Sequence, residues 1–215
     1  MNLSRVIDFL FSRYCLGCGR EGDFICSFCR QRLPRRDLHP YHLTGQRFID
    51  GIYSPFFFQG IIRRAIVELK YRNLKAVSAT LANLLSECLK DNSLPGEILV
   101  PVPLHPKRVR QRGYNQSFLL CRDLGRIIDL PVAGNSLFRS CHTRQQVDLS
   151  KEERRLNVAG AFSLHGEELK EKEVLLVDDV STTGATLDSC AKVLKAGGSR
   201  KVWGLTIAQE EHETG

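Results

Sequence analysis

The sequence predicts an α/β protein built around a mostly parallel sheet, with a small four-cysteine module ahead of it. Two observations carry this prediction. Short apolar runs alternate with helical patterns from residue 52 to residue 207, the order expected of parallel strands joined by crossover helices. Before them, four cysteines stand as two Cys-x2-Cys pairs. We expect the module to occupy residues 1–45 and the α/β domain to occupy residues 46–215.

The first residues predict a short amphipathic helix rather than a secretion signal. Arg5 and Asp8 interrupt the apolar stretch, and no small-residue cleavage site follows. The apolar residues fall at helical spacing: Leu3, Val6, Ile7 and Leu10. No apolar run approaches the roughly 18 residues of a membrane span. We therefore expect a cytoplasmic protein whose eight cysteines stay reduced or bind metal.

The two cysteine pairs are a specific signal for zinc. Each pair turns tightly enough for both sulfurs to face one point, and two pairs complete a tetrahedral thiolate site for Zn2+. The ligands would be Cys15, Cys18, Cys26 and Cys29. Four thiolates close the coordination sphere, so the zinc is expected to be structural, with His39 and His42 as ordinary loop residues. A redox-active pair is the alternative, and the absence of a thioredoxin-like pattern disfavours it.

The α/β part is expected to follow a polar connector over residues 37–51, which contains Pro and Gly residues that disfavour regular structure. Apolar runs predict strands at residues 52–58, 98–102, 174–177 and 202–207, and a short strand that ends at Phe162. Apolar residues at helical spacing predict helices at residues 61–71, 77–89, 116–128 and 185–195. In such a sheet, ligands bind beyond the carboxyl ends of the strands.

The most informative segment is VLLVDDVSTTGAT at residues 174–186. Its apolar residues predict a buried strand with Asp178 and Asp179 at the tip. A hydroxyl-rich loop then opens into a helix, and backbone N–H groups, hydroxyls and the helix dipole together suit a phosphate. The loop residues are Ser181, Thr182, Thr183, Gly184, Ala185 and Thr186.

The paired carboxylates suit two vicinal hydroxyls or a hydrated Mg2+ beside that phosphate, so the segment predicts a ribose 5-phosphate site. Helix capping is the alternative, but capping explains one hydroxyl and not four of them with two acids. The segment is also not a P-loop, because no Gly-Lys-Ser or Gly-Lys-Thr follows.

This segment resembles the phosphoribosyl pyrophosphate (PRPP) motif of type I phosphoribosyltransferases. The whole chain resembles the ComF family of competence-associated proteins, in which a four-cysteine zinc module precedes a type I phosphoribosyltransferase-like domain. The resemblance also rests on LKY at residues 69–71 and on PVPLHPKRVRQRGYNQS at residues 101–117. It includes a spaced set further on: Arg139, Thr143, Gln146, Leu149, Arg154, Asn157, Gly160 and Phe162.

The resemblance implies a role for each motif. Asp178 and Asp179 would hold the ribose hydroxyls of PRPP with Mg2+, and loop 181–186 would hold the 5-phosphate. Residues 101–108 would take the pyrophosphate-loop position. Four cations there could neutralise a diphosphate or equally contact a nucleic-acid backbone: Lys107, Arg108, Arg110 and Arg112. A lid over the reaction would include Arg139, Thr143, Gln146, Arg154 and Asn157.

Three functions stay open on the sequence. As an enzyme, the chain would catalyse displacement at ribose C1 with loss of pyrophosphate, but no residue marks the general base or the acceptor. As a competence factor it could bind single-stranded DNA, since residues 1–166 carry 25 basic against 14 acidic residues. As a scaffold, it could dock a helicase or another recombination protein through the zinc module.

Overall fold

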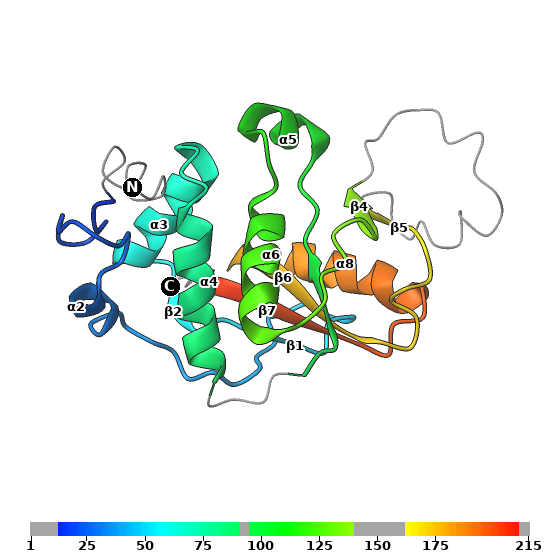
Figure 1. Ribbon diagram of the computed structural model, residues 1–215. Coiled ribbons are helices and arrows are strands. Elements are labelled where there is room, and N and C mark those ends of the chain that lie inside the picture. Colours follow the sequence, from blue (N-terminus) through cyan, green and yellow to red (C-terminus); the bar gives the residue numbers. More distant parts are fainter. Residues whose placement is uncertain (1–12, 91–94, 140–161, 211–215) are drawn as a thin grey trace.

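The computed structural model describes residues 13–90, 95–139 and 162–210 (Figure 1). The main sheet contains β1 (Gly51–Tyr53), β2 (Phe56–Phe57), β3 (Ile98–Pro101), β6 (Glu173–Ser181) and β7 (Lys201–Gln209). Its order is β1-β7-β6-β3, with β2 also paired to β7, and every pairing in it is parallel. A separate antiparallel pair consists of β4 (Leu137–Arg139) and β5 (Phe162–Leu164).

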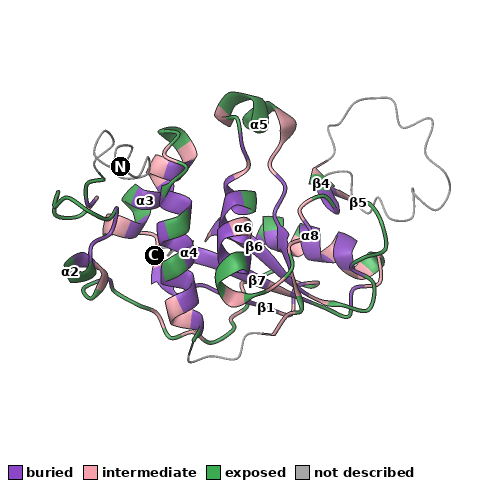
Figure 2. Cartoon of the chain, viewed as in Figure 1, coloured by how far each residue is buried: buried purple, intermediate pink, exposed green. Residues whose placement is uncertain are grey.

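Helices cover both faces of the main sheet. On one face lie α3 (Gly60–Tyr71), α4 (Val77–Leu89) and α6 (Gln116–Ile128), and on the other lies α8 (Ala185–Ala196). Side chains of β6 alternate between the two cores, because successive residues of a strand point to opposite faces. Leu175 and Val177 pack with the three helices, and Val174 and Leu176 pack with α8. Figure 2 shows the central strands as the most completely buried part of the chain.

The four-cysteine module packs against α3 and α4. Cys15, Ile25 and Leu33 belong to the same buried cluster as the apolar faces of these helices. Arg30, in the short helix α2 (Ser27–Arg30), forms a 2.5 Å ion pair with Glu87 of α4. Arg64 of α3 donates a 3.0 Å hydrogen bond to the carbonyl of residue 16. The module therefore shares the core of the α/β part, while the boundary at residue 45 stays a prediction.

The four predicted helices are confirmed to within one residue at each end. The predicted strand over residues 52–58 is wrong as one element: it divides into β1 and β2 at Ser54 and Pro55, where proline lacks the N–H that a sheet ladder needs. The strand predicted to end at Phe162 instead continues to Leu164 in β5. Among the described residues, no helix is long and apolar enough to cross a membrane.

Two further differences concern the site. β6 does not end at Val177 but continues through the two aspartates to Ser181, because β7 runs for nine residues and pairs with it as far as Gln209. An additional helix, α5 (Pro106–Arg112), interrupts the expected connection after β3. The N-terminal helix and four of the lid residues (Thr143, Gln146, Arg154 and Asn157) lie outside the described residues.

Candidate functional site

Two adjacent carboxylates occupy the last part of β6. Asp178 is half-buried, and its Oδ1 accepts hydrogen bonds from Ser117 Oγ and from the backbone N–H of Asp179, both at 2.9 Å. Burial raises the pKa of Asp178 to about 7, and the charge of Asp179 adds to the rise. The two hydrogen bonds and the charge of Lys70 oppose it. Asp178 thus titrates near neutrality in the ligand-free protein.

Asp179 is buried, with 3% of its surface exposed. Its Oδ1 forms a 2.6 Å ion pair with Nζ of Lys70 at the end of α3, and its Oδ2 has no hydrogen-bond partner among the described residues. Lys70 belongs to the motif at residues 69–71, and the sequence alone assigns it no role. Its partner lies more than a hundred residues away, so spacing along the chain carries no sign of this pair.

The phosphate loop (residues 181–186) joins β6 to α8. Three hydroxyl residues of the loop, Thr182, Thr183 and Thr186, are exposed, and the buried Ser181 Oγ has no described partner. Gly184, with φ of 71°, precedes the helix, and no side chain caps it. The N–H of Ala185, the first residue of α8, donates a long hydrogen bond of 3.4 Å to Thr183 Oγ1. The start of a helix favours an anion, because its first N–H groups have no carbonyl partner within the helix.

Asp188 in the first turn of α8 does not place its charge against this loop. Its Oδ1 accepts the backbone N–H groups of residues 47, 48 and 49 at 3.0, 2.7 and 3.1 Å. These bonds hold the connector that follows the cysteine module against α8. The same connector carries Gln46, whose Nε2 lies directly at Gly184: a Cβ built there would be 1.8 Å from it.

We expect Gly184→Ala to lower the free energy of unfolding by about 2 kcal/mol, because the methyl group must displace the end of the Gln46 side chain in addition to the cost of a positive φ. The matched control is Gly166→Ala: Gly166 has φ of 77° and nothing within 4 Å of its Cβ position. This control carries only the backbone cost, about 1 kcal/mol. Urea denaturation measures both variants, and equal losses would rule out the steric contribution of Gln46.

The four predicted cations all lie on α5, which projects beyond the sheet in a basic arm (residues 102–115) at the top of Figure 1. Asn115 Nδ2 donates a 3.0 Å hydrogen bond to the carbonyl of Val102 and joins the two ends of the arm. Arg108 and Arg112 line a cleft of about 430 Å³ together with Lys70. Lys107 and Arg110 are exposed and do not line it. The structure therefore brings together two of the four cations.

The four cysteines converge as predicted. Their sulfurs all lie within 4.8 Å of one another, with Cys18 exposed and the other three buried, so the set fits one tetrahedral ion. Burial opposes ionisation of Cys15, but backbone N–H groups, led by that of Cys26, outweigh it and lower its pKa to about 6. Burial and the neighbouring thiols raise the pKa of Cys29 to about 12. Ionisation of Cys29 therefore needs the charge of a metal.

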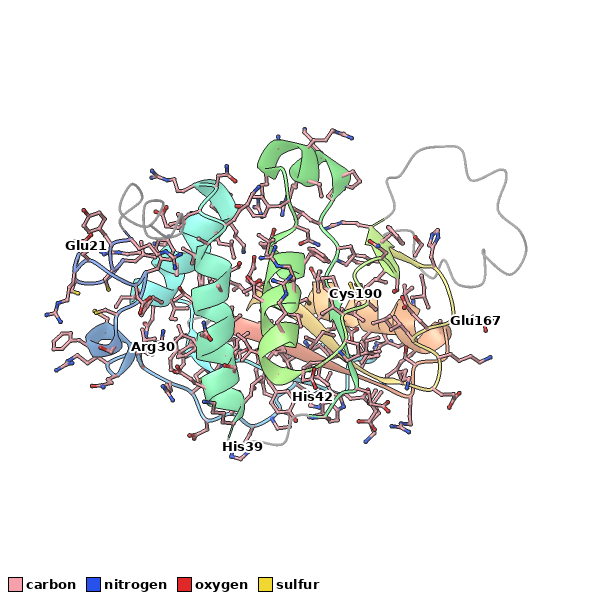
Figure 3. All side chains as sticks on the ribbon, viewed as in Figure 1. Glu21, Arg30, His39, His42, Glu167 and Cys190 are labelled. Carbon is pink, nitrogen blue, oxygen red and sulfur yellow. The ribbon has the colours of Figure 1, made fainter. Side chains whose placement is uncertain are left out.

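His39 and His42 are not part of this cluster. Figure 3 labels both along the lower edge of the molecule, away from Arg30 at the end of α2. Arg139, the one described member of the predicted lid, is half-buried in β4 with its guanidinium 5.4 Å from the ring centroid of Phe162.

Comparison with known proteins decides the family. No family model matches the chain. Competence protein F of Haemophilus influenzae is 35% identical over 205 residues, which cover 91% of this chain and 85% of that protein. The chain belongs to the ComF family. Among other ComF relatives, DNA utilization protein YhgH of Escherichia coli K12 is 33% identical over 65% of this chain and 64% of its own length. Competence protein ComFC of Bacillus subtilis is 26% identical over 72% and 62%.

Solved structures similar to this ComF chain include two phosphoribosyltransferases. Orotate phosphoribosyltransferase from Aeropyrum pernix has 16% identity and a TM-score of 0.42 over 84% of this chain and 77% of that one. Purine phosphoribosyltransferase from Pyrococcus horikoshii has 18% identity and a TM-score of 0.37 over 60% and 70%. Similarity at this level says nothing about the reaction. The mostly parallel α/β sheet behind a four-cysteine module, as predicted, is confirmed by the strand order and the cysteine cluster.

Proposed function

We propose that this ComF-family chain binds PRPP together with Mg2+ at the carboxyl end of β6 and acts in DNA uptake or natural transformation. One arrangement carries the proposal. Two carboxylates, a loop with three exposed threonines and the start of α8 follow one another within ten residues of the chain. This combination offers acceptors for a diol beside donors for a phosphate.

Each part of PRPP would then have a partner of matching chemistry. The 5-phosphate would lie in the phosphate loop, where Ser181 Oγ has no described partner. The ribose hydroxyls would donate to Asp178 and Asp179, whose Oδ2 is likewise without one. The diphosphate would contact cations of the basic arm, among which Arg108 is exposed. Mg2+ would neutralise charge between the carboxylates and the ligand.

The wider role rests on the relatives. Curated relatives carry the names competence protein and DNA utilization protein, and the second name states a use of DNA. A zinc ion at the four cysteines would be structural and would hold the module on α3. Phosphoribosyl transfer to an acceptor would be an additional activity, and no described residue is marked as its general base.

Calorimetric titration with PRPP in the presence and absence of Mg2+ tests the site. We expect Mg2+-dependent binding that Asp178→Asn with Asp179→Asn weakens at least about tenfold, since both acceptors for the diol and metal lose their charge. The matched control is Glu97→Gln with Glu173→Gln. It removes two carboxylates at the amino ends of β3 and β6, whereas the proposed site lies at the carboxyl end of β6. Unchanged affinity in the aspartate variant, or no binding to the zinc-loaded protein, would refute the proposal.

The pKa of Asp178 gives a second test through pH. Its pKa of about 7 in the folded protein lies above the ordinary 3.8, so the ligand-free protein loses stability as pH rises through 7. The diol and Mg2+ prefer the ionised form of Asp178, which is the form present above this pH. Affinity for PRPP with Mg2+ should therefore rise up to about tenfold between pH 6 and pH 8. The single variant Asp178→Asn separates this step from titration of PRPP itself: an unchanged pH profile in the variant would assign the step to the ligand.

A further inference from the structure

Cys18 is the exposed member of the four-cysteine cluster. The other three cysteines of the cluster are buried, and all four sulfurs lie within 4.8 Å of one another. The Sγ atoms of Cys18 and Cys26 are 3.6 Å apart. A reagent in solution therefore reaches the cluster at Cys18, and a second thiol stands directly beside it. Thiols that bind a metal do so as thiolates, which is also the nucleophilic form of cysteine.

Cys18 lines a cleft of about 340 Å³ between the cysteine module and the start of α3. Gly17 and Cys29 line it from the module, and Gly60 and Ile61 line it from the helix. The two walls pack against each other, since a Cβ built at Gly17 would lie 2.5 Å from Cδ1 of Ile61. Pockets that hold small molecules have volumes of about 300–1,000 Å³, so the cleft can accept part of a small ligand.

Two arginines make this cleft positive. Arg32 and Arg64 line it, and no acidic side chain is among the described residues that do. Both are exposed, and the Nη1 of each donates a 3.0 Å hydrogen bond, to the carbonyls of Phe28 and Leu16. A metal-bound cluster would carry about two negative charges. Residues 13–36 hold six arginines against two acids, so the module stays positive and favours a reagent with carboxylates.

We propose that Cys18 is a redox modification site that reacts with an anionic disulfide of the glutathione type and thereby releases the metal. The Cys18 thiolate attacks one sulfur of the disulfide, whose S–S bond breaks, and one glutathione leaves as a thiolate. The Cys26 thiolate then attacks the Cys18 sulfur and displaces the second glutathione thiolate. Two protein thiolates are oxidised to one disulfide, while one glutathione disulfide is reduced to two thiolates. The cluster has then lost two of its four ligands.

The consequence is a reversible loss of stability. The cysteine module shares its buried core with α3 and α4, so release of the metal would loosen this contact. A thiol reductant would restore the four ligands. The inference rests on the proposed metal at the four cysteines. It does not involve the proposed PRPP site, because none of the residues that line this cleft belongs to that site.

Zinc release, followed with a chromogenic chelator, tests the inference on the full zinc-loaded chain treated with oxidised glutathione. Cys18→His keeps a ligand for zinc but removes the thiol, so it should release zinc at least about tenfold more slowly than the wild type. Peptide mass mapping should find a Cys18–Cys26 disulfide in the wild type. Cys26→His should instead keep one glutathione on Cys18, because the second attack is lost. Equal release from Cys18→His, or a first adduct on another cluster cysteine, overturns the inference.

Cystamine, a positively charged disulfide, separates the effect of the cleft from mere exposure of the thiol. Arg32→Gln with Arg64→Gln should slow the reaction of oxidised glutathione about tenfold without slowing that of cystamine. The matched control is Arg63→Gln, since Arg63 is exposed on α3 but does not line the cleft. Equal slowing with both disulfides, or in the control, overturns the role of the cleft. A folded chain that binds no zinc refutes the proposed metal, and mapping of the first adduct still decides whether Cys18 is the reactive thiol.

Discussion

Cys29→Ser is expected to release the proposed zinc ion and to lower the free energy of unfolding by at least about 3 kcal/mol, or roughly 10 °C in melting temperature. Cys29 is buried, and its sulfur belongs to the four-sulfur cluster. The module shares its core with α3 and α4, so loss of the metal exposes apolar surface on the α/β part as well. Elemental analysis and thermal melting with and without a chelator measure the two effects.

The matched control is Cys88→Ser, which removes a half-buried thiol from α4 outside the cluster. This variant should keep about one zinc per chain and should be insensitive to mild chelation, apart from a small packing loss. Wild-type protein that is folded, metal-free and as stable as the zinc-loaded form would contradict the prediction. So would a Cys29→Ser variant that still binds one zinc per chain with unchanged melting.

Local patterns were sufficient for most of the fold. Continuous apolar periodicity predicted α3, α4 and α6 because those helices bury one face against the sheet. It missed α5, whose sequence PKRVRQR contains one apolar side chain besides its proline and buries none of its residues. The ends of α5 did carry a signal: Pro106 in the first turn and Gly113 in the left-handed conformation just after the last turn are typical helix limits.

The candidate site could be predicted only where its residues are adjacent in sequence. The aspartates and the phosphate loop form one continuous segment, so their order alone indicates their chemistry. Apolar residues alone predict a strand that stops at Val177, but the end of a strand also depends on the length of its neighbour, here β7. Contacts between segments far apart in the sequence could not be predicted from local patterns. Examples are the contact of Lys70 with Asp179 and that of Tyr71 with Arg112.

Lys70→Met should lower the free energy of unfolding by about 3 kcal/mol, because it leaves the carboxylate of Asp179 buried without its only described ion-pair partner. The Asp179 side chain is 4% exposed and that of Lys70 20%, so water cannot replace the lost cation fully. The charge of Lys70 also lowers the pKa of Asp178. Asp178 should therefore titrate at a higher pH in Lys70→Met than in the wild type. Urea denaturation at pH 8 measures the stability, and the pH profile of PRPP binding measures the shift.

A double-variant cycle isolates the pair from the loss of one side chain. Asp179→Asn in the Lys70→Met background removes the uncompensated charge and should recover most of the lost stability. Arg200→Met is the matched surface control: Arg200 contacts Glu97 and Glu173 at 3.5 and 3.3 Å, but its side chain is 54% exposed, so its loss should cost less than about 1 kcal/mol. If Lys70→Met costs no more than Arg200→Met, the buried pair does not stabilise the fold. Lys70 would then be held beside Asp179 only until a ligand displaces it, and its loss would change PRPP affinity without changing stability.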